Sequence, residues 1–242
     1  MLKFNPWGMA VLFSGDDPKE TVDAILSENY REEFCISPDF DPAYIAGLME
    51  AGFLVMSMYT GEPENIDTPR YAVLLPKLHR ERAVLRFGDL HVSGSVRRLL
   101  GQYELRPDSD FDGILSRCAA VHGDDWLTAP LRHRFTGLHR SGGYPVRMRS
   151  FGLYREGKLA AGEFGVSVGR VYTSYSGYYE ENSAGTVQMI LTSRYLESAG
   201  FALWDLGMPM EYKSRLGAVS LSREEFLGVF RRFSAQQEPE EE

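Results

Sequence analysis

The segment formed by residues 147–206 limits the possible folds more than any other part of the chain. Its β-rich runs predict three short strands in succession, at 147–154, 159–168 and 170–178. The two gaps between them are short, polar and contain a glycine, which is typical of hairpin turns. The segment therefore predicts a meander of three neighbouring strands.

A helix and a further strand follow this meander. Asn182 and Ser183 open a helical pattern that ends near Gly200, and residues 201–206 are short and almost continuously apolar, as a buried strand should be. The order meander, helix, strand is the core of N-acyltransferase-like folds. We therefore expect an α+β protein that places a donor at the start of the helix and the chemistry on the flanking strands.

Bulk properties exclude several classes of protein. The chain has 242 residues, 43% of them hydrophobic, which is enough for one large domain or two small ones. No apolar run reaches the roughly 18 residues of a membrane span, and residues 1–7 lack the apolar region of a secretion signal. Cys35 and Cys118 are far from metal-ligand spacing. We expect a cytoplasmic protein with two free thiols, without a cofactor or metal.

The charge is unevenly distributed. A net charge of −8 disfavours nucleic acid, but four of the last five residues are Glu. Seven cations, opposed only by Glu156, lie between positions 131 and 158: Arg132, Arg134, Arg140, Arg147, Arg149, Arg155 and Lys158. A local basic surface can bind phosphate although the whole molecule is acidic. Solvated arginines on helix and hairpin faces would explain the same cluster.

Several helices outside the central segment have recognisable starts. We expect helices at 18–30, at 43–51 after an Asp41 N-cap and Pro42, at 93–102, at 111–122 and at 131–141. Ser222 with Glu225 forms a capping box that opens a last helix ending near Ser234. A soft boundary near 105–110 predicts a small N-terminal domain at 1–107, a GNAT-like domain at 108–235 and a disordered acidic tail at 236–242.

Short patterns between about residues 38 and 230 together carry a resemblance. They are Pro-Arg-Tyr-Ala-Val-Leu at 69–74 with Pro76 and Leu78-His79, Leu-His-Val-Ser-Gly-Ser-Val-Arg-Arg at 90–98, Asp-Trp-Leu at 125–127, Leu-His at 138–139, Gly-Glu-Phe-Gly-Val at 162–166, Leu-Gly-Ala at 216–218 and Arg-Glu-Glu-Phe-Leu at 223–227. In their order and spacing they resemble the leucyl/phenylalanyl-tRNA–protein transferase family. Such enzymes move Leu or Phe from a charged tRNA to an N-terminal Arg or Lys of a protein, which marks it for degradation.

This resemblance implies partners, a fold and several site residues. The partners would be the 3′ end of an aminoacyl-tRNA and a protein N-terminus, bound by a monomer with a GNAT-like C-terminal domain. Trp126 would stack on the terminal adenosine of the donor, as aromatic side chains do with unpaired bases; the alternative is a packing residue. Asp205 would belong to a polar network around the reacting centre; the alternative is a salt-bridging acid. Further substrate-binding positions would be Ser150, Ser176, Tyr178 and Gly207.

The chain also departs from the family at important positions. The family pattern Gly-Glu-Ser-Met-Phe-Ser becomes Ser-Tyr-Ser-Gly-Tyr-Tyr at 174–179, so that the family's Glu falls on Tyr175. The family's Gln two positions after the Asp falls on Gly207, and its nearby His falls on Tyr212. The helix-start pattern Asn-Ala-Ser-Lys becomes Ser-Ala-Gly-Thr at 183–186. These substitutions predict altered acceptor chemistry.

Two side chains are candidates for the missing carboxylate function. Tyr175 would donate to the leaving oxygen or orient the amine, but its ordinary pKa of about 10 makes it a poor base. Glu163 stands where the family has an apolar residue, and it would replace the lost Glu if it faced the same side as Tyr175; the alternative is a solvent-facing strand residue. The tyrosines of this strand, Tyr172, Tyr175, Tyr178 and Tyr179, would line a substrate pocket or simply pack the sheet.

Two other functions fit the same residues. Small residues and free amides at 182–186, a helix start, would suit the phosphates of an acyl-CoA donor. A non-catalytic relative that only binds tRNA or a peptide N-terminus is the second alternative.

Overall fold

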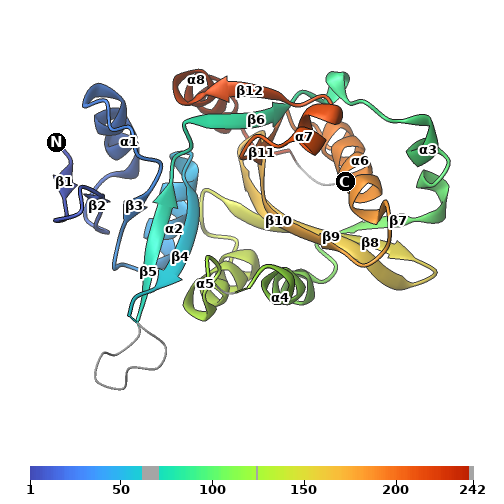
Figure 1. The fold of residues 1–242 in the computed structure, drawn as a ribbon, viewed down its shortest axis with the longest axis horizontal. Coiled ribbons are helices and arrows are strands. Elements are labelled where there is room, and N and C mark those ends of the chain that lie inside the picture. Colours follow the sequence, from blue (N-terminus) through green and yellow to red (C-terminus); the bar gives the residue numbers. More distant parts are fainter. Residues whose placement is uncertain (62–70, 124, 240–242) are drawn as a thin grey trace. The chain divides into compact units, whose positions relative to one another are not determined.

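The computed structural model describes residues 1–61, 71–123 and 125–239 (Figure 1). The chain divides into two compact units. The first unit comprises Met1–Arg80 and His122–Pro145, and the second unit comprises Glu81–Val121 and Val146–Glu242. This division differs from a single boundary near residue 107, because two strands that precede that position pair within the sheet of the second unit.

The first unit is built on two small sheets. Strands β1 (Lys3–Phe4), β2 (Ala10–Val11) and β3 (Cys35–Ile36) form one of them. Strands β4 (Leu54–Tyr59) and β5 (Ala72–Lys77) form an antiparallel pair. The helices of this unit are α1 (Pro18–Ser27), α2 (Pro42–Glu50) and α5 (Ala129–Arg140).

The helix starts of the first unit follow from their capping residues. The Asp17 side chain accepts hydrogen bonds from two backbone N–H groups of α1, and the Asp41 side chain accepts one from Tyr44 N. Each carboxylate satisfies N–H groups that have no partner within the helix. The Asp41 cap is confirmed, and α1 ends three residues before the expected Tyr30.

The second unit contains a seven-stranded sheet in the order β12-β6-β11-β10-β9-β8-β7. Its strands are β6 (Glu81–Leu85), β7 (Glu104–Pro107), β8 (Arg147–Arg155), β9 (Lys158–Val168), β10 (Val171–Tyr179), β11 (Leu203–Gly207) and β12 (Val219–Ser222). Its helices are α3 (Gly94–Arg97), α4 (Phe111–His122), α6 (Ala184–Ser198), α7 (Glu211–Arg215) and α8 (Arg223–Ser234), with short 3₁₀ turns at Phe87–Asp89 and Leu100–Gln102.

The meander, helix and strand expected from the sequence are confirmed. Strands β8, β9 and β10 pair antiparallel in succession, and β11 returns parallel to β10 after α6. Gly157 and Gly169 hold positive φ angles of 76° and 52° at the two hairpin turns, which glycine adopts without strain. The capping box of Ser222 and Glu225 is also present at the start of α8. The single helix expected at 93–102 is instead the short α3 followed by a 3₁₀ turn.

The two faces of the large sheet carry different helices. On one face, which we call the α6 face, Phe151, Tyr172 and Trp204 pack with Leu196 of α6 in one buried apolar cluster. On the other, the α4 face, Phe111 of α4 contacts Phe164 edge-on, with a ring-centroid distance of 6.3 Å. Because adjacent residues of a regular strand point to opposite faces, this assignment fixes the direction of the neighbouring side chains as far as the next register shift.

The acidic tail is partly ordered. Glu238 Oε1 accepts hydrogen bonds from Arg149 Nη2 (2.6 Å) and Ser167 Oγ (2.5 Å), so the expected disorder does not extend to this residue. Pro69 and Arg70, which begin one of the matched patterns, and residues 240–242 of the expected tail lie outside the described residues. Within the described ranges, no helix is both long and apolar enough to cross a membrane.

Candidate functional site

Strands β10 and β11 part from one another near the middle of the sheet. Their parallel pairing covers Val171↔Leu203, Tyr172↔Trp204 and Thr173↔Asp205, and among the described residues no later pair joins them. Strand β10 continues along β9 with a register shift between Ser174 and Ser176. Such a bulge redirects side chains and is frequent beside functional sites. The residues just beyond Thr173 and Asp205 therefore form the candidate site.

Asp205 is held at this position by a complete set of partners. Arg82 of β6 donates from Nε to both carboxylate oxygens at 3.1 Å, and its Nη2 lies 3.0 Å from Oδ2. Thr173 Oγ1 donates to Oδ2 at 3.0 Å, and the backbone N–H of Gly207 donates to Oδ1 at 2.8 Å. Asp205 is 0% exposed. Both of its carboxylate oxygens are therefore engaged by groups of the protein.

The end of β11 is tied down by Asp205 and by a buried lysine. Gly207 has a φ of +72°, and its N–H is the one that Asp205 accepts. Lys213 of α7 donates from Nζ to the carbonyls of Leu206 (2.6 Å) and Met208 (2.8 Å). Burial lowers the pKa of Lys213 to about 8, although the charges of Asp205 and Glu163 oppose this effect.

Glu163 belongs to a polar chain that crosses from β9 to β11. Trp204 Nε1 donates to Ser174 Oγ at 2.8 Å, and Ser174 Oγ donates in turn to Glu163 Oε2 at 3.3 Å. Glu163 is only 5% exposed, so it is not the solvent-facing residue considered as the alternative. Burial raises the pKa of its carboxyl to about 7, against the lowering effect of nearby Gln188, Ser174, Tyr172 and Lys213.

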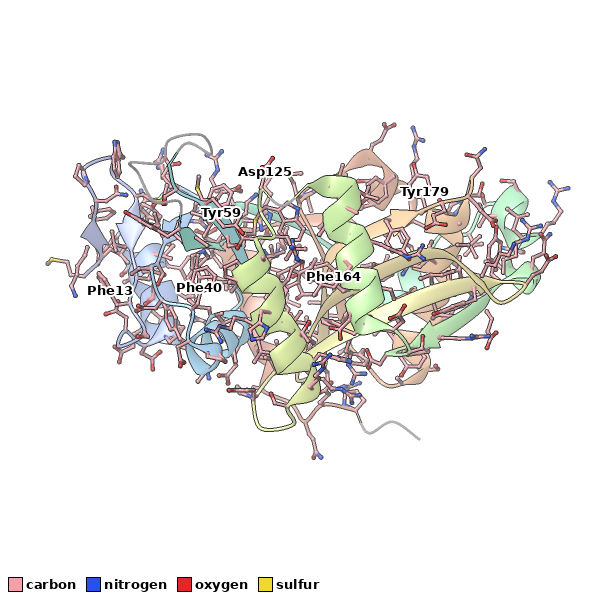
Figure 2. The ribbon with its side chains drawn as sticks, turned by 90° about the horizontal axis from the view of Figure 1, so that it is seen from below. Phe13, Phe40, Tyr59, Asp125, Phe164 and Tyr179 are labelled. Atoms are coloured by element: carbon pink, nitrogen blue, oxygen red, sulfur yellow. The ribbon has the colours of Figure 1, made fainter. Side chains whose placement is uncertain are left out.

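Glu163 and Tyr175 face opposite sides of the sheet. The Tyr175 ring stacks on Phe164, with centroids 5.9 Å apart and 25° between planes, and Phe164 lies on the α4 face. Figure 2 labels Phe164 beside α4. Glu163 precedes Phe164 on β9, and its partners Ser174 and Trp204 belong to the α6 face. The condition under which Glu163 would replace the carboxylate lost at Tyr175 is therefore not met.

The remaining expected positions on β8 and β10 lie mainly inside the protein. Ser150 is fully buried, and its N–H donates to Asp108 Oδ1 at 2.7 Å. Ser176 is half-buried, and its carbonyl accepts from Cys118 Sγ at 3.6 Å. Tyr178 is buried under α4, where the Arg117 guanidinium lies 5.8 Å from its ring centroid. The bulge places Tyr178 on the α4 face and Tyr172 on the α6 face, so the tyrosines of β10 do not line a single pocket.

Trp126 lies in the first unit and is half-buried. Its carbonyl accepts a hydrogen bond from Ser57 N of β4 at 2.9 Å, which fixes the backbone that carries the indole. The Ser57 hydroxyl also lies 2.8 Å from Thr128 Oγ1. Partial exposure on a fixed backbone is compatible with both readings of this residue, stacking on a base and packing.

Some residues of the site were not expected from the sequence. Arg82 stands among apolar neighbours in β6, and an arginine in such a strand indicates a buried acid nearby; that signal was present in Glu81–Leu85. Lys213 and Trp204 had no comparable signal. Both cysteines are buried free thiols, as expected. The described residues contain no group of three or more His, Cys, Asp and Glu suited to holding a metal ion.

Together, the meander, the crossing helix and a parallel strand that parts from its neighbour define a GNAT-like fold class. The family assignment follows from comparison with known proteins. The model of the family "Leucyl/phenylalanyl-tRNA protein transferase" matches residues 84–231, so the chain belongs to this family.

Two sequence relatives agree with this assignment. The Leucyl/phenylalanyl-tRNA--protein transferase of Pseudomonas putida (strain W619) is 33% identical over 151 residues, which cover 60% of this chain and 65% of the relative. The protein of the same name from Rubrobacter xylanophilus is 34% identical over 149 residues, which cover 60% of this chain and 75% of the relative. Among solved structures, FemX gives a TM-score of 0.46 at 10% identity, covering 88% of this chain and 78% of FemX. The chain thus matches 65% of the length of the first relative.

Proposed function

We propose that this chain transfers an amino acid from an aminoacyl-tRNA to the amino terminus of a protein. The observation that supports this most strongly is the retained Asp205, whose carboxylate holds the Gly207 N–H where β10 and β11 part, in a chain that belongs to the transferase family. An N–H fixed in this way keeps the end of β11 in one conformation. A preorganised strand end suits a reaction that depends mainly on alignment.

The transfer needs no co-reactant. The neutral amine nitrogen attacks the ester carbonyl carbon, the C–N bond forms, and the bond between that carbon and the ribose oxygen breaks. The amine loses one proton and the leaving oxygen gains one. Alignment of the two substrates supplies much of the rate, and donors near the carbonyl oxygen stabilise its developing charge.

The expected residues take the following roles in the proposal. Asp205 is a positioning residue, because its carboxylate is buried and both of its oxygens accept hydrogen bonds from neighbouring protein groups. Tyr175 is half-buried and would donate to the leaving oxygen from its place on Phe164. Trp126 would stack on the terminal adenosine of the tRNA. Ser176 and Gly207 would border the substrate.

The setting of this reaction is also part of the proposal. We infer a cytoplasmic monomer whose partners are the 3′ end of a charged tRNA and an exposed protein N-terminus. The exposed cations of the cluster between positions 131 and 158 support the first partner, since tRNA binding depends on phosphate contacts. Arg149 does not contribute, because it is buried and paired with Glu238.

The test is a transfer assay with a panel of radiolabelled aminoacyl-tRNAs and a peptide that begins with Arg. The expected result is label on the peptide, and none on a control peptide whose N-terminus is acetylated. Failure of every charged tRNA at high enzyme concentration would overturn the proposal. Stabilisation by acetyl-CoA in that case would indicate the acyl-CoA alternative, and tRNA binding without transfer would indicate a non-catalytic relative.

A further inference from the structure

Two buried polar atoms on the α6 face have no hydrogen-bond partner among the described residues. They are Glu163 Oε1 and the Tyr172 hydroxyl. The two lie near one another, because Tyr172 extends over Gly165, the next residue of β9 on the same face; a Cβ at Gly165 would be 2.7 Å from the Tyr172 hydroxyl. A buried carboxylate oxygen without a partner is costly, and a cationic ligand beside it would offset that cost.

No cation of the protein satisfies Glu163. In the described part of the chain, Glu163 forms no ion pair within 4.0 Å. The ammonium of the nearby Lys213 donates its hydrogen bonds to two backbone carbonyls. The other polar groups around the carboxylate are neutral. Ser174 donates to the second oxygen, and Gln188 of α6 donates from Nε2 to Thr192 Oγ1 at 2.8 Å. The cluster thus carries one acid that has no ion-pair partner among the described residues.

The cluster lies one residue below the surface. Gly177 is the register partner of Glu163 on β10 and is exposed, and a Cβ at this position would lie 3.2 Å from Glu163 Cβ. Because glycine has no side chain, residue 177 places no Cβ against that flank of Glu163, which is itself 5% exposed. Tyr212 of α7 is 46% exposed, and the charge of Glu163 raises the pKa of its hydroxyl after the larger effect of burial. A ligand side chain that entered beside Gly177 would meet Glu163 at its tip.

We propose that Glu163, with Tyr172 and Ser174 beside it, recognises the ammonium or guanidinium group of a basic donor amino acid. This inference rests on the proposed function and names its donor class. The relatives are named for leucyl and phenylalanyl groups, which are apolar. The family resemblance places an apolar residue at position 163. A carboxylate at this position would pair with a cationic donor side chain in place of an apolar one. Charge-assisted hydrogen bonds of this kind are among the strongest in proteins.

The first experiment compares kcat/KM for transfer from Arg-, Lys-, Leu- and Phe-tRNA to one peptide, using wild type, Glu163→Gln and Glu163→Met. We expect wild type to prefer a basic donor by at least about tenfold, the scale of one hydrogen bond to a charged group. Glu163→Gln should lose that preference, and Glu163→Met should favour Leu and Phe. Glu156→Gln, in the exposed hairpin turn, is the matched control and should behave as wild type.

Two results would overturn the inference while leaving the proposed function intact. One is a wild-type preference for Leu or Phe that Glu163→Gln does not alter. The other is a loss of kcat/KM in Glu163→Gln that is larger for an acceptor peptide beginning with Arg than for one beginning with Ala, and that is the same for all donors. That result would assign the carboxylate to the acceptor's cation instead.

A binding measurement separates the inference from failure of the reaction itself. Stable 3′-lysylamido- and 3′-leucylamido-adenosine are titrated into wild type and Glu163→Gln by calorimetry. Tighter binding of the lysyl compound to wild type alone supports cation recognition even if no tRNA is a substrate. Equal affinity of both compounds for wild type would overturn it.

Discussion

The Arg82 guanidinium and the Asp205 carboxylate form a buried ion pair between β6 and β11, 123 residues apart in the sequence. Their side chains are 2% and 0% exposed, and the Phe226 ring lies 4.5 Å below the guanidinium carbon. The pair joins two strands and orients the N–H of Gly207 at the same time. It therefore links the stability of the sheet to the geometry of the candidate site.

Asp205→Asn should lower the free energy of unfolding by about 3–5 kcal/mol, because it leaves the Arg82 charge buried without its counter-charge. Urea denaturation measures the change. The matched control is Glu211→Gln, which removes an exposed pair with Arg215 whose side chains are 80% and 74% exposed. That variant should change stability by less than about 1 kcal/mol. Similar values for both variants would contradict the assigned role of the buried pair.

Stability should depend on pH through Glu163. Its folded pKa, raised by burial to about 7 from 4.5, means that the folded protein keeps a proton that the unfolded chain releases. The free energy of unfolding should therefore fall as pH rises from about 4.5 to about 7, by about 3 kcal/mol in total. Glu163→Gln should lack this fall, so its stability relative to wild type should increase over that range. If the free energy of unfolding changed with pH in the same way in both proteins, the pH dependence could not be assigned to Glu163.

Gly165→Ala should destabilise the protein strongly. Its Cβ would lie 2.2 Å from the Thr173 carbonyl oxygen and 2.7 Å from the Tyr172 hydroxyl, and the first contact is with backbone that cannot move aside easily. We expect a loss of about 1–3 kcal/mol or more by thermal or urea unfolding. Gly228→Ala is the control: this position in α8 is exposed and open, so the change should stabilise by about 0.5–1 kcal/mol.

Trp126→Ala should weaken binding of a charged tRNA about tenfold or more, since stacking of one base on an aromatic side chain contributes about 1–3 kcal/mol. Filter binding at fixed salt measures the affinity. Trp7→Ala, at an 87% exposed position of the same unit, should leave it unchanged. Equal affinity of the Trp126 variant and wild type would remove this residue from the proposed tRNA site.

Local patterns predicted the elements of the fold better than their partners. The glycine turns, the Asp41 cap and the Ser222 capping box act over a few residues, and all three are present in the structure. The place of β6 beside β11 depends on contacts across more than a hundred positions, which no local pattern contains. The boundary expected near residue 107 differs from the observed division for the same reason.

Some residues of the candidate site were predictable from the sequence, and its geometry was not. Asp205 and Glu163 stand out as single acids in apolar strands. Whether Glu163 and Tyr175 share a face depends on strand register and on the bulge between Ser174 and Ser176, which are properties of paired strands. Arg82 and Lys213 enter from other elements and complete the electrostatics of the site.

The hydrogen bond from the Trp204 indole to Ser174, and from there to Glu163, supplies an optical reporter inside the protein. Indole fluorescence responds to nearby charge and to the bond made by its N–H. The chain has three tryptophans, and Trp7 and Trp126 lie in the first unit. With both replaced by Phe, the remaining emission would follow ionisation of Glu163 during a pH titration. The same signal would register arrival of a cationic group without any label on the substrate.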